Sequence, residues 1–319
     1  SWEYQGVHPR LWSEYNLALP DFLGYVFLTQ GYKKYDMEER KARYESFQTI
    51  KSRNMTATTI NSSGVDQYVL SSNVMHYRWV MKEVPGLKEE VYTSSVNNHI
   101  SKIEFQFKEY REPLLEQTVM DSWPVVVEKL MQSEQFGREI SKENPLVKEI
   151  AGPLRNAVTG NLELTRKIYT WVRDNFACID HSMLYRDQSF RNLLKSRKGN
   201  VAEINLLLAA MLVQENIDAD PVILSTRSHG FVYSSYPLLH QYNYVVVKTT
   251  IDGKTYFLDA TEPLLGFNRL PLRCYNDEAR IIDEKAAIIS CRTDSLNETK
   301  NTSVFMVNDE QGNMIGSMN

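Results

Sequence analysis

The sequence predicts an α+β fold in two units, an antiparallel β domain over residues 1–118 and an α+β domain over residues 119–285. Strand-like patterns fill the first unit, helical periodicity starts after Asp121, and strand patterns return after Asp220. Helices that precede a run of strands are typical of an α+β domain. Residues 286–319 contain one further hairpin pattern, and we expect them to begin a third, β-rich domain. We expect both outer units to be incomplete.

The first unit is predicted to be a partial β-sandwich, because its segments combine β-branched and aromatic residues. Residues 102–110, KIEFQFKEY, place Ile103, Phe105 and Phe107 on one face by strict alternation. The charged segment 33–48 interrupts the pattern and fits either a helix or a long strand. The other predicted strands are YVFLTQ (25–30), QYVLSS (67–72) and HYRWVMKEV (76–84).

Two amphipathic helices are predicted at the start of the second unit. Residues 121–140 have polar cap candidates and an early proline, Pro124. Residues 161–176 carry one apolar stripe, formed by Leu164, Ile168, Trp171 and Val172. Such a stripe indicates packing into a core and not a cofactor site.

A third helix begins at Val201 and is the most informative part of the sequence. Asn200 is a suitable N-cap, and Glu203, three residues further on, can close a capping box. The run Ile204–Val213 is apolar nearly all round, which indicates a helix buried in the centre of the domain. Val201 stands in the first turn, where many thiol enzymes place a reactive cysteine.

Three strands are predicted after this helix, over residues 220–227, 242–249 and 254–261. The pair Asp252-Gly253 between the last two is a strong signal for a type I′ hairpin turn. These segments predict an antiparallel meander against which the central helix can pack.

Composition argues against several classes of function. The chain has 36 basic and 40 acidic residues, mixed along the sequence, so no basic block is present to bind the phosphates of a nucleic acid. The longest apolar run, Ile204–Val213, falls well below the roughly 20 residues needed to cross a bilayer. The first residues lack a basic start followed by an apolar stretch, so we expect no targeting peptide among them. We therefore expect membrane association only through other parts of the parent protein.

The three cysteines, Cys178, Cys274 and Cys291, do not form a disulfide framework, and their redox state stays open. Cys178 has His181 three residues on and Asp187 nearby, which superficially resembles a catalytic set. Residues this close in sequence rarely reach base-to-nucleophile geometry, and Cys178 follows a helix C-terminus, where the dipole raises a thiol pKa. We therefore expect a packed or idle thiol. The Cys-x-x-His spacing lacks the second ligand pair of a structural zinc site, so we expect no metal and no cofactor.

A helix that starts after a glycine, followed by a meander ending in LDAT, resembles the transglutaminase-like superfamily, whose core also includes papain-related thiol enzymes. KGNVAEIN resembles the Cys motif of that family with Val201 at the cysteine, and QYNYVVV resembles its His strand with Tyr244 at the histidine. YFLDAT keeps the third catalytic position as Asp259. The resemblance implies a papain-like α+β core with a central buried helix packed on an antiparallel sheet.

The two substitutions remove the chemistry that the family performs. Catalysis there needs a thiolate, whose pKa is lowered by the helix N-terminus, and an imidazole that transfers the proton. Valine has no ionisable atom, and a tyrosine with an ordinary pKa near ~10 is a poor base at pH 7. We therefore expect that the protein is not an enzyme. Neither His240 nor His229 restores the base, because His240 lies about 13 Å along the strand from Tyr244, at about 3.3 Å per residue, and His229 lies in a solvated loop.

Residual roles are expected for several side chains around these positions. Asp259 is expected to hydrogen-bond Tyr244 or a backbone N–H, as a structural residue. Free backbone N–H groups at the helix start could receive an anionic group. The residues expected to line a cleft there are Asn200, Glu203, Asn243 and His229.

The N-terminal region, with EVPGLKEEVY leading into KIEFQFKEY, resembles a domain of unknown function that precedes transglutaminase-like cores in a group of bacterial cell-envelope proteins. This resemblance implies a periplasmic or cell-surface location. We expect a non-catalytic binding or scaffolding module for a protein, a peptide or a glycan such as a surface polymer. The alternatives are an active thiol peptidase or amide transferase, and a purely structural segment of a larger protein.

Overall fold

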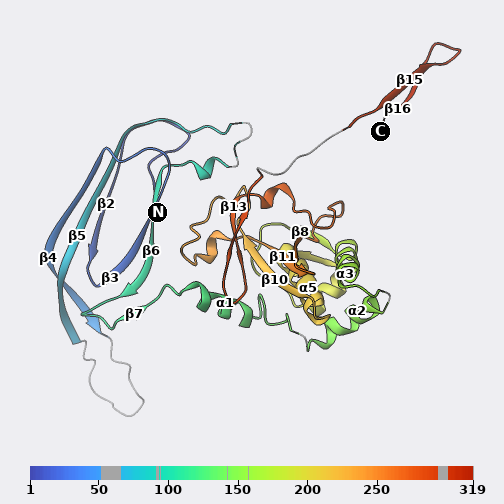
Figure 1. The fold of residues 1–319 in the computed structure, drawn as a ribbon. Coiled ribbons are helices and arrows are strands. Elements are labelled where there is room, and N and C mark those ends of the chain that lie inside the picture. Colours follow the sequence, from blue (N-terminus) through green and yellow to red (C-terminus); the bar gives the residue numbers. More distant parts are fainter. Residues whose placement is uncertain are drawn as a thin grey trace.

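The computed structural model describes residues 1–51, 66–90, 93, 95–141, 143–156, 158–293 and 301–318. Their arrangement confirms the α+β class, with antiparallel sheets in a first unit and helices around an antiparallel sheet in a second unit (Figure 1).

The first unit contains two antiparallel sheets. One sheet has the order β1-β6-β3, with β7 also paired to β6, and the other has the order β2-β5-β4. The segment that fitted a helix or a strand is the long strand β4, paired along its length with β5. The elements are β1 (Trp2–Glu3), β2 (Arg10–Pro20), β3 (Leu23–Gln30), β4 (Met37–Lys51), β5 (Asp66–Val84), η1 (Val96–Asn98), β6 (Lys102–Tyr110) and β7 (Gln117–Thr118).

Aromatic side chains hold the two sheets together. The rings of Tyr77 and Trp79 on β5 stack with centroids 5.1 Å apart, and Phe27 on β3 meets Trp79 edge to face at 5.6 Å. Ile103 is almost fully buried, and Phe105 packs on the same cluster. The alternation along 102–110 thus directs its apolar face to the space between the sheets.

The second unit begins with helices. The prediction for residues 161–176 agrees with α3, whose stripe is buried at Leu164, Ile168 and Val172. The predicted helix over 121–140 is wrong in its length, because α1 ends at Gln132 and the chain turns so that Phe136 can enter the core. The helices are α1 (Trp123–Gln132), α2 (Pro145–Arg155), α3 (Asn161–Asn175), α4 (Phe190–Ser196) and α5 (Val201–Gln214).

The sheet of the second unit has the order β12-β11-β10-β13-β14, with every pair antiparallel. Asp252 and Gly253 both have positive φ, as the predicted type I′ turn requires. β14 lies beyond the boundary predicted at residue 285 yet pairs with β13, so the sheet continues past that boundary. The strands are β10 (Asp218–Leu224), β11 (Tyr244–Ile251), β12 (Lys254–Leu258), β13 (Asp277–Ile281) and β14 (Ile288–Cys291), with η2 (Leu239–Gln241) and η3 (Leu272–Cys274) in the loops.

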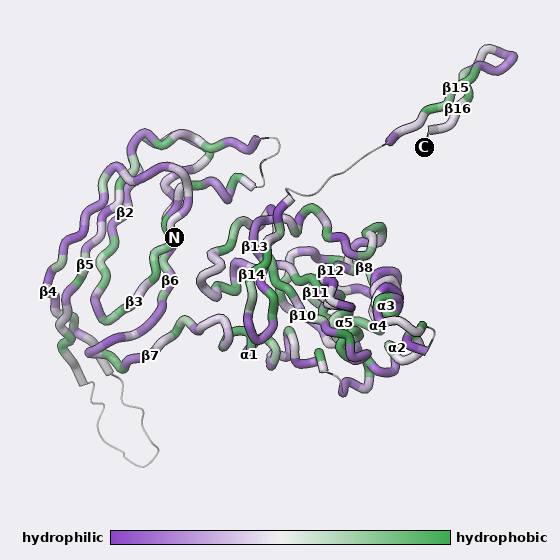
Figure 2. Tube along the Cα trace, viewed as in Figure 1, coloured by the Kyte–Doolittle hydropathy of each residue, from purple (hydrophilic) through white to green (hydrophobic). Residues whose placement is uncertain are grey.

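Helix α5 lies at the centre of this unit, between the sheet and the other helices (Figure 1, Figure 2). Every residue from Val201 to Leu212 is buried, as the all-round apolar pattern predicts. A short parallel pair, β8 (Ala177–Asp180) with β9 (Lys198–Asn200), leads directly into its first turn. This pair therefore places the segment around Cys178 beside the start of α5.

The last described segment is a two-stranded hairpin, β15 (Val304–Asn308) with β16 (Met314–Met318), which agrees with the hairpin pattern in the sequence. Its large apolar side chains are exposed, and Figure 2 shows the hairpin away from the body of the molecule. Across the ranges given above, no helix is long and apolar enough to span a membrane.

Candidate functional site

The N-terminus of α5 is closed by its own side chains. Asn200 Oδ1 accepts the N–H of Glu203 at 2.9 Å, and Glu203 Oε2 accepts the N–H of Asn200 at 2.9 Å, which completes the predicted capping box. The Glu203 carboxylate also accepts the backbone N–H groups of Asp187 at 2.9 Å and Gln188 at 3.0 Å. The first turn is thus tied to the segment that precedes α4.

Val201 and Tyr244 belong to one buried cluster. Val201 is the first residue of α5, Tyr244 is the first residue of β11, and both are fully buried. The cluster also contains Cys274, and Cys178 packs against its edge. The positions that resemble the catalytic Cys and His are therefore filled by an isopropyl group and a phenol within the same apolar core.

Asp259 completes this arrangement directly after β12. Tyr244 Oη donates to Asp259 Oδ2 at 2.7 Å, and Asn205 Nδ2 of α5 donates to Asp259 Oδ1 at 3.0 Å. Thr261 adds a hydroxyl and a backbone N–H, at 2.7 and 3.1 Å. The carboxylate thus has four donors from three elements, although it is completely buried. The structure thus brings Tyr244 and Asp259 into direct contact.

The side chains expected to line a cleft do not line one. Asn200, Glu203 and Asn243 are all less than a tenth exposed and are engaged in hydrogen bonds, as in the contact of Asn243 Oδ1 with Thr226 N at 2.8 Å. His229 is exposed and lies with Nε2 3.2 Å from the carbonyl oxygen of His240, outside this cluster. The expectation of an open anion site at the helix start is corrected, because the capping box and its neighbours already occupy that space.

Cys178 and His181 come closer together than the sequence reasoning allowed. Cys178 Sγ lies 3.5 Å from His181 Nδ1 and donates to Asp180 O at 3.3 Å. The register of β8 on β9 shifts between Cys178 and Asp180, directly before His181, and the short separation in sequence could not reveal this irregularity. Asp187 is not part of the group, because its carboxylate faces Asn200 Nδ2 at 3.4 Å.

Two residues near this pair were missed in the sequence. His181 Nε2 lies 3.9 Å from Glu262 Oε1, and Arg273 Nη2 donates to the same oxygen at 2.5 Å. The one available signal was the TEP segment directly after Asp259, which carries Glu262. Arg273 comes from η3 and has no motif around it.

Comparison with known proteins identifies the second unit. Residues 148–257 match the model of the transglutaminase-like superfamily, a range that includes α5, β10 and β11. These residues form a transglutaminase-like domain. No curated protein matches the chain.

Two solved structures are similar to this chain, and the first of them agrees with its fold. A proposed protease from Parabacteroides distasonis has a TM-score of 0.52 and 15% identity, over 92% of this chain and 47% of that one. The chain thus spans about half the length of that protein. A proposed cysteine protease from Cytophaga hutchinsonii has a TM-score of 0.30 and 12% identity, over 79% of each chain.

Electrostatics in the transglutaminase-like domain favour neutral forms of the groups that could react. Burial raises the pKa of Tyr244 far above its ordinary value, and the neighbouring Asp259 charge raises it further. Burial raises the pKa of the Cys178 thiol to about 12. Burial and the Arg273 charge lower the pKa of His181. A thiolate–imidazolium pair is therefore disfavoured at neutral pH.

A metal-binding site needs several ligand side chains close together. Within the described ranges, His, Cys, Asp and Glu side chains form no group of three suited to a metal ion. Catalytic zinc sites use three such ligands, so the Cys178–His181 pair lacks the further partner that a metal centre needs.

Proposed function

We propose that the transglutaminase-like domain is non-catalytic and acts as a binding or scaffolding module for a partner protein, a peptide or a surface polymer. One observation carries the proposal. The nucleophile position holds the fully buried Val201, and the base position holds Tyr244, whose hydroxyl is committed to Asp259 at 2.7 Å. Neither position therefore carries a side chain that can attack a substrate or transfer a proton.

The hydrogen bonds around Asp259 support a structural role for the remnant of the site. Its carboxylate is satisfied by Tyr244, Asn205 and Thr261, and a buried polar network of this kind stabilises one arrangement of the core. The carboxylate that would orient a base instead connects α5 to β11 and β12.

An amide-turnover assay tests the proposal. The purified chain is incubated with fluorogenic peptide amides and with a glutamine peptide plus a primary amine, beside the variant Cys178→Ala. We expect no hydrolysis or amine incorporation above background in either protein. The double variant Val201→Cys/Tyr244→His, with its fold checked by circular dichroism, tests whether a cysteine and a histidine at these two positions are enough for amide turnover. Turnover in the parent chain that Cys178→Ala abolishes would overturn the proposal.

A thiol peptidase or amide transferase is the second candidate, and one observation favours it. Cys178, His181 and Glu262 follow one another at 3.5 and 3.9 Å, an order that matches a nucleophile, a base and an orienting carboxylate. The raised thiol pKa and the lowered imidazole pKa oppose this role, which is why we rank it second. The same assay decides between the two.

We also propose that the protein works in a bacterial envelope, in the periplasm or at the cell surface. The support is the resemblance of its N-terminal region, around residues 85–110, to the domain that precedes transglutaminase-like cores in envelope proteins. Cell fractionation with an antibody against this chain tests the location. Recovery in the cytoplasmic fraction alone would contradict it.

A further inference from the structure

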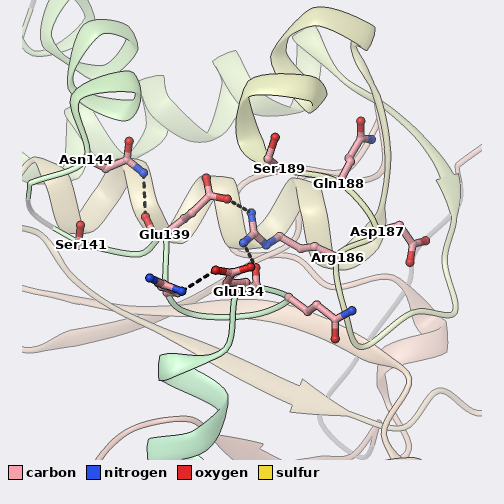
Figure 3. A pocket seen from close by; sticks show the side chains of 10 residues that line it. Glu134, Glu139, Ser141, Asn144, Arg186, Asp187, Gln188 and Ser189 are labelled. Carbon is pink, nitrogen blue, oxygen red and sulfur yellow. Dashed lines mark hydrogen bonds and ion pairs between the residues drawn. The ribbon is translucent and has the colours of Figure 1, made fainter.

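We propose that a polar pocket beside the start of α5 binds a neutral, hydroxyl-rich ligand, namely the end of a glycan. This inference rests on the proposed binding function and names the site and the ligand class for it. The pocket has a volume of about 460 Å³, which is within the range of small-molecule sites. It lies between the segment joining α1 to α2 and residues 186–189 (Figure 3).

Arg186 forms a fixed floor for this pocket. Its side chain is 2% exposed, and its Nη1 donates to Glu139 Oε1 at 2.9 Å. Nη2 donates to the backbone oxygen of Glu134, and the guanidinium stands 4.4 Å from the centre of the Phe190 ring. Because Arg186 is held on three sides, the Glu139 carboxylate is held in a defined orientation (Figure 3).

The opposite wall is fixed by α5. The backbone N–H groups of Asp187 and Gln188 donate to the buried Glu203 carboxylate, and Asp187 Oδ2 accepts from Asn200 Nδ2 at 3.4 Å. Figure 3 shows Asp187 apart from the Arg186 group, with Gln188 beside it. A ligand would therefore meet preorganised side chains, which lowers the entropic cost of binding.

Several groups at the pocket have hydrogen-bonding capacity to spare. The side chains of Gln135 and Ser141 have no hydrogen-bond partner among the described residues, and both residues are exposed. Asp187 uses only one carboxylate oxygen, toward Asn200. Together they offer an amide, a hydroxyl and a carboxylate oxygen, which can both donate to and accept from ligand hydroxyls.

Charge at the pocket argues against ionic ligands. Arg138 pairs with Glu134 at 2.5 Å and Arg186 pairs with Glu139 at 2.9 Å, so the two basic side chains are already neutralised. Asp187 is the remaining carboxylate of the lining. The lining has three carboxylates against two guanidinium groups, which disfavours a phosphate. Among the described residues, the carboxylates form no group of three suited to a metal ion.

The lining also argues against a peptide. Many peptides bind along a free sheet edge or place apolar side chains in a groove. This pocket is built from loops and helix starts, and all of its lining side chains are polar or charged. Hydroxyl groups match such a lining because each can both donate and accept a hydrogen bond. Two neighbouring hydroxyls can also donate to the two oxygens of one carboxylate.

Titration with neutral disaccharides tests the inference on the intact chain. Cellobiose, maltose and N,N′-diacetylchitobiose are titrated by two-dimensional NMR, beside glucose 6-phosphate and the neutral dipeptide Gly-Gln. We expect saturable shifts at residues 134–141 and 186–189 with at least one neutral disaccharide.

Asp187→Ala and Gln135→Ala should each weaken that binding at least tenfold. Glu163→Ala, which removes an exposed carboxylate from a pocket on α3, is the matched control and should leave it unchanged.

Gln135→Ala distinguishes a loss of ligand contacts from a loss of folded structure, because the Gln135 side chain is outside the hydrogen-bond network that holds the start of α5. Absence of saturable binding by all three disaccharides would overturn the inference, and so would binding that both pocket variants leave unchanged. Binding of the phosphate or the dipeptide alone would overturn the ligand class. The non-catalytic assignment falls only if amide turnover is found, so failure of one proposal is distinct from failure of the other.

Discussion

Tyr244 supplies a hydrogen-bond donor to a carboxylate that is completely buried. The phenol donates to Asp259 at 2.7 Å, so the buried carboxylate keeps a donor where the resemblance places an imidazole. Leaving that oxygen without a donor would cost about 1–3 kcal/mol. The Tyr244 hydroxyl thereby contributes to the stability of the core around Asp259.

The Cys178 thiol gives a prediction about pH at this scale. Its pKa is raised by burial from 9.0 to about 12, a difference of three units. Below pH 9 the thiolate fraction is therefore about a thousandfold smaller than for an unperturbed thiol, since each unit is tenfold. We expect the rate of iodoacetamide alkylation at Cys178, followed by peptide mass spectrometry, to keep rising through pH 10. The urea-unfolded chain is the control, and a plateau near pH 9 in the folded chain would contradict the raised pKa.

Single residues could be predicted where a motif surrounds them. Val201, Tyr244 and Asp259 stand in segments with recognisable order and spacing, and the Tyr244–Asp259 contact follows from pairing of β11 with β12. The Cys178–His181 contact lies at the end of β8, whose parallel pairing with β9 has no periodic signal in the sequence. Arg273 reaches Glu262 from a distant loop, so no local pattern could place it.

Helix α5 is the element on which the site depends. Its capping box fixes the first turn, and the same Glu203 carboxylate holds residues 187 and 188, which form one wall of the polar pocket. Loss of the cap would therefore loosen the start of α5 and that wall together.

Replacing Asn200 by alanine measures this coupling. The change removes the acceptor for the Glu203 N–H at 2.9 Å and the amide contact with Tyr185 O at 3.0 Å. We expect the free energy of unfolding in urea to fall by about 1–2 kcal/mol, as for strong N-caps. Asn144→Ala, which removes the longer 3.4 Å cap of α2 at a half-buried site, is the matched control and should cost less. Equal losses of unfolding free energy for the two variants would mean that the capping box of α5 contributes no more to stability than the cap of α2.

Elements could be predicted where the local signal was unambiguous. The Asp252-Gly253 turn and the burial of α5 agree with their patterns. The segment 33–48 stayed ambiguous because its charges suit either a helix or a strand face, and pairing with β5 decides for the strand. The helix predicted over 121–140 ends early because tertiary packing of Phe136 competes with local helix propensity.

At the scale of the whole molecule, the two units meet at a loop that leads to the site. Asn98 Oδ1 in η1 of the first unit accepts the N–H of Phe231 at 2.6 Å. Within the second unit, Trp123 Nε1 at the start of α1 donates to Ser234 O at 2.9 Å. Both contacts fall in the loop between β10 and β11, which precedes Tyr244. The Asn98–Phe231 hydrogen bond therefore ties the first unit to this loop.

The β15–β16 hairpin differs from the rest of the molecule in its stability, and hydrogen exchange can measure the difference. Phe305 is 65% exposed, Met306 62% and Met314 73%, so these strands bury little apolar surface. A two-stranded hairpin without a packed face is marginally stable in water. We expect its amides to exchange within seconds at neutral pH and 25 °C, while those of β10 and β11, whose residues are mostly buried, exchange only on global unfolding. Exchange in the hairpin as slow as in β11 would show that another surface covers it in solution, and dilution of the sample would then reveal whether that surface belongs to a second copy of the chain.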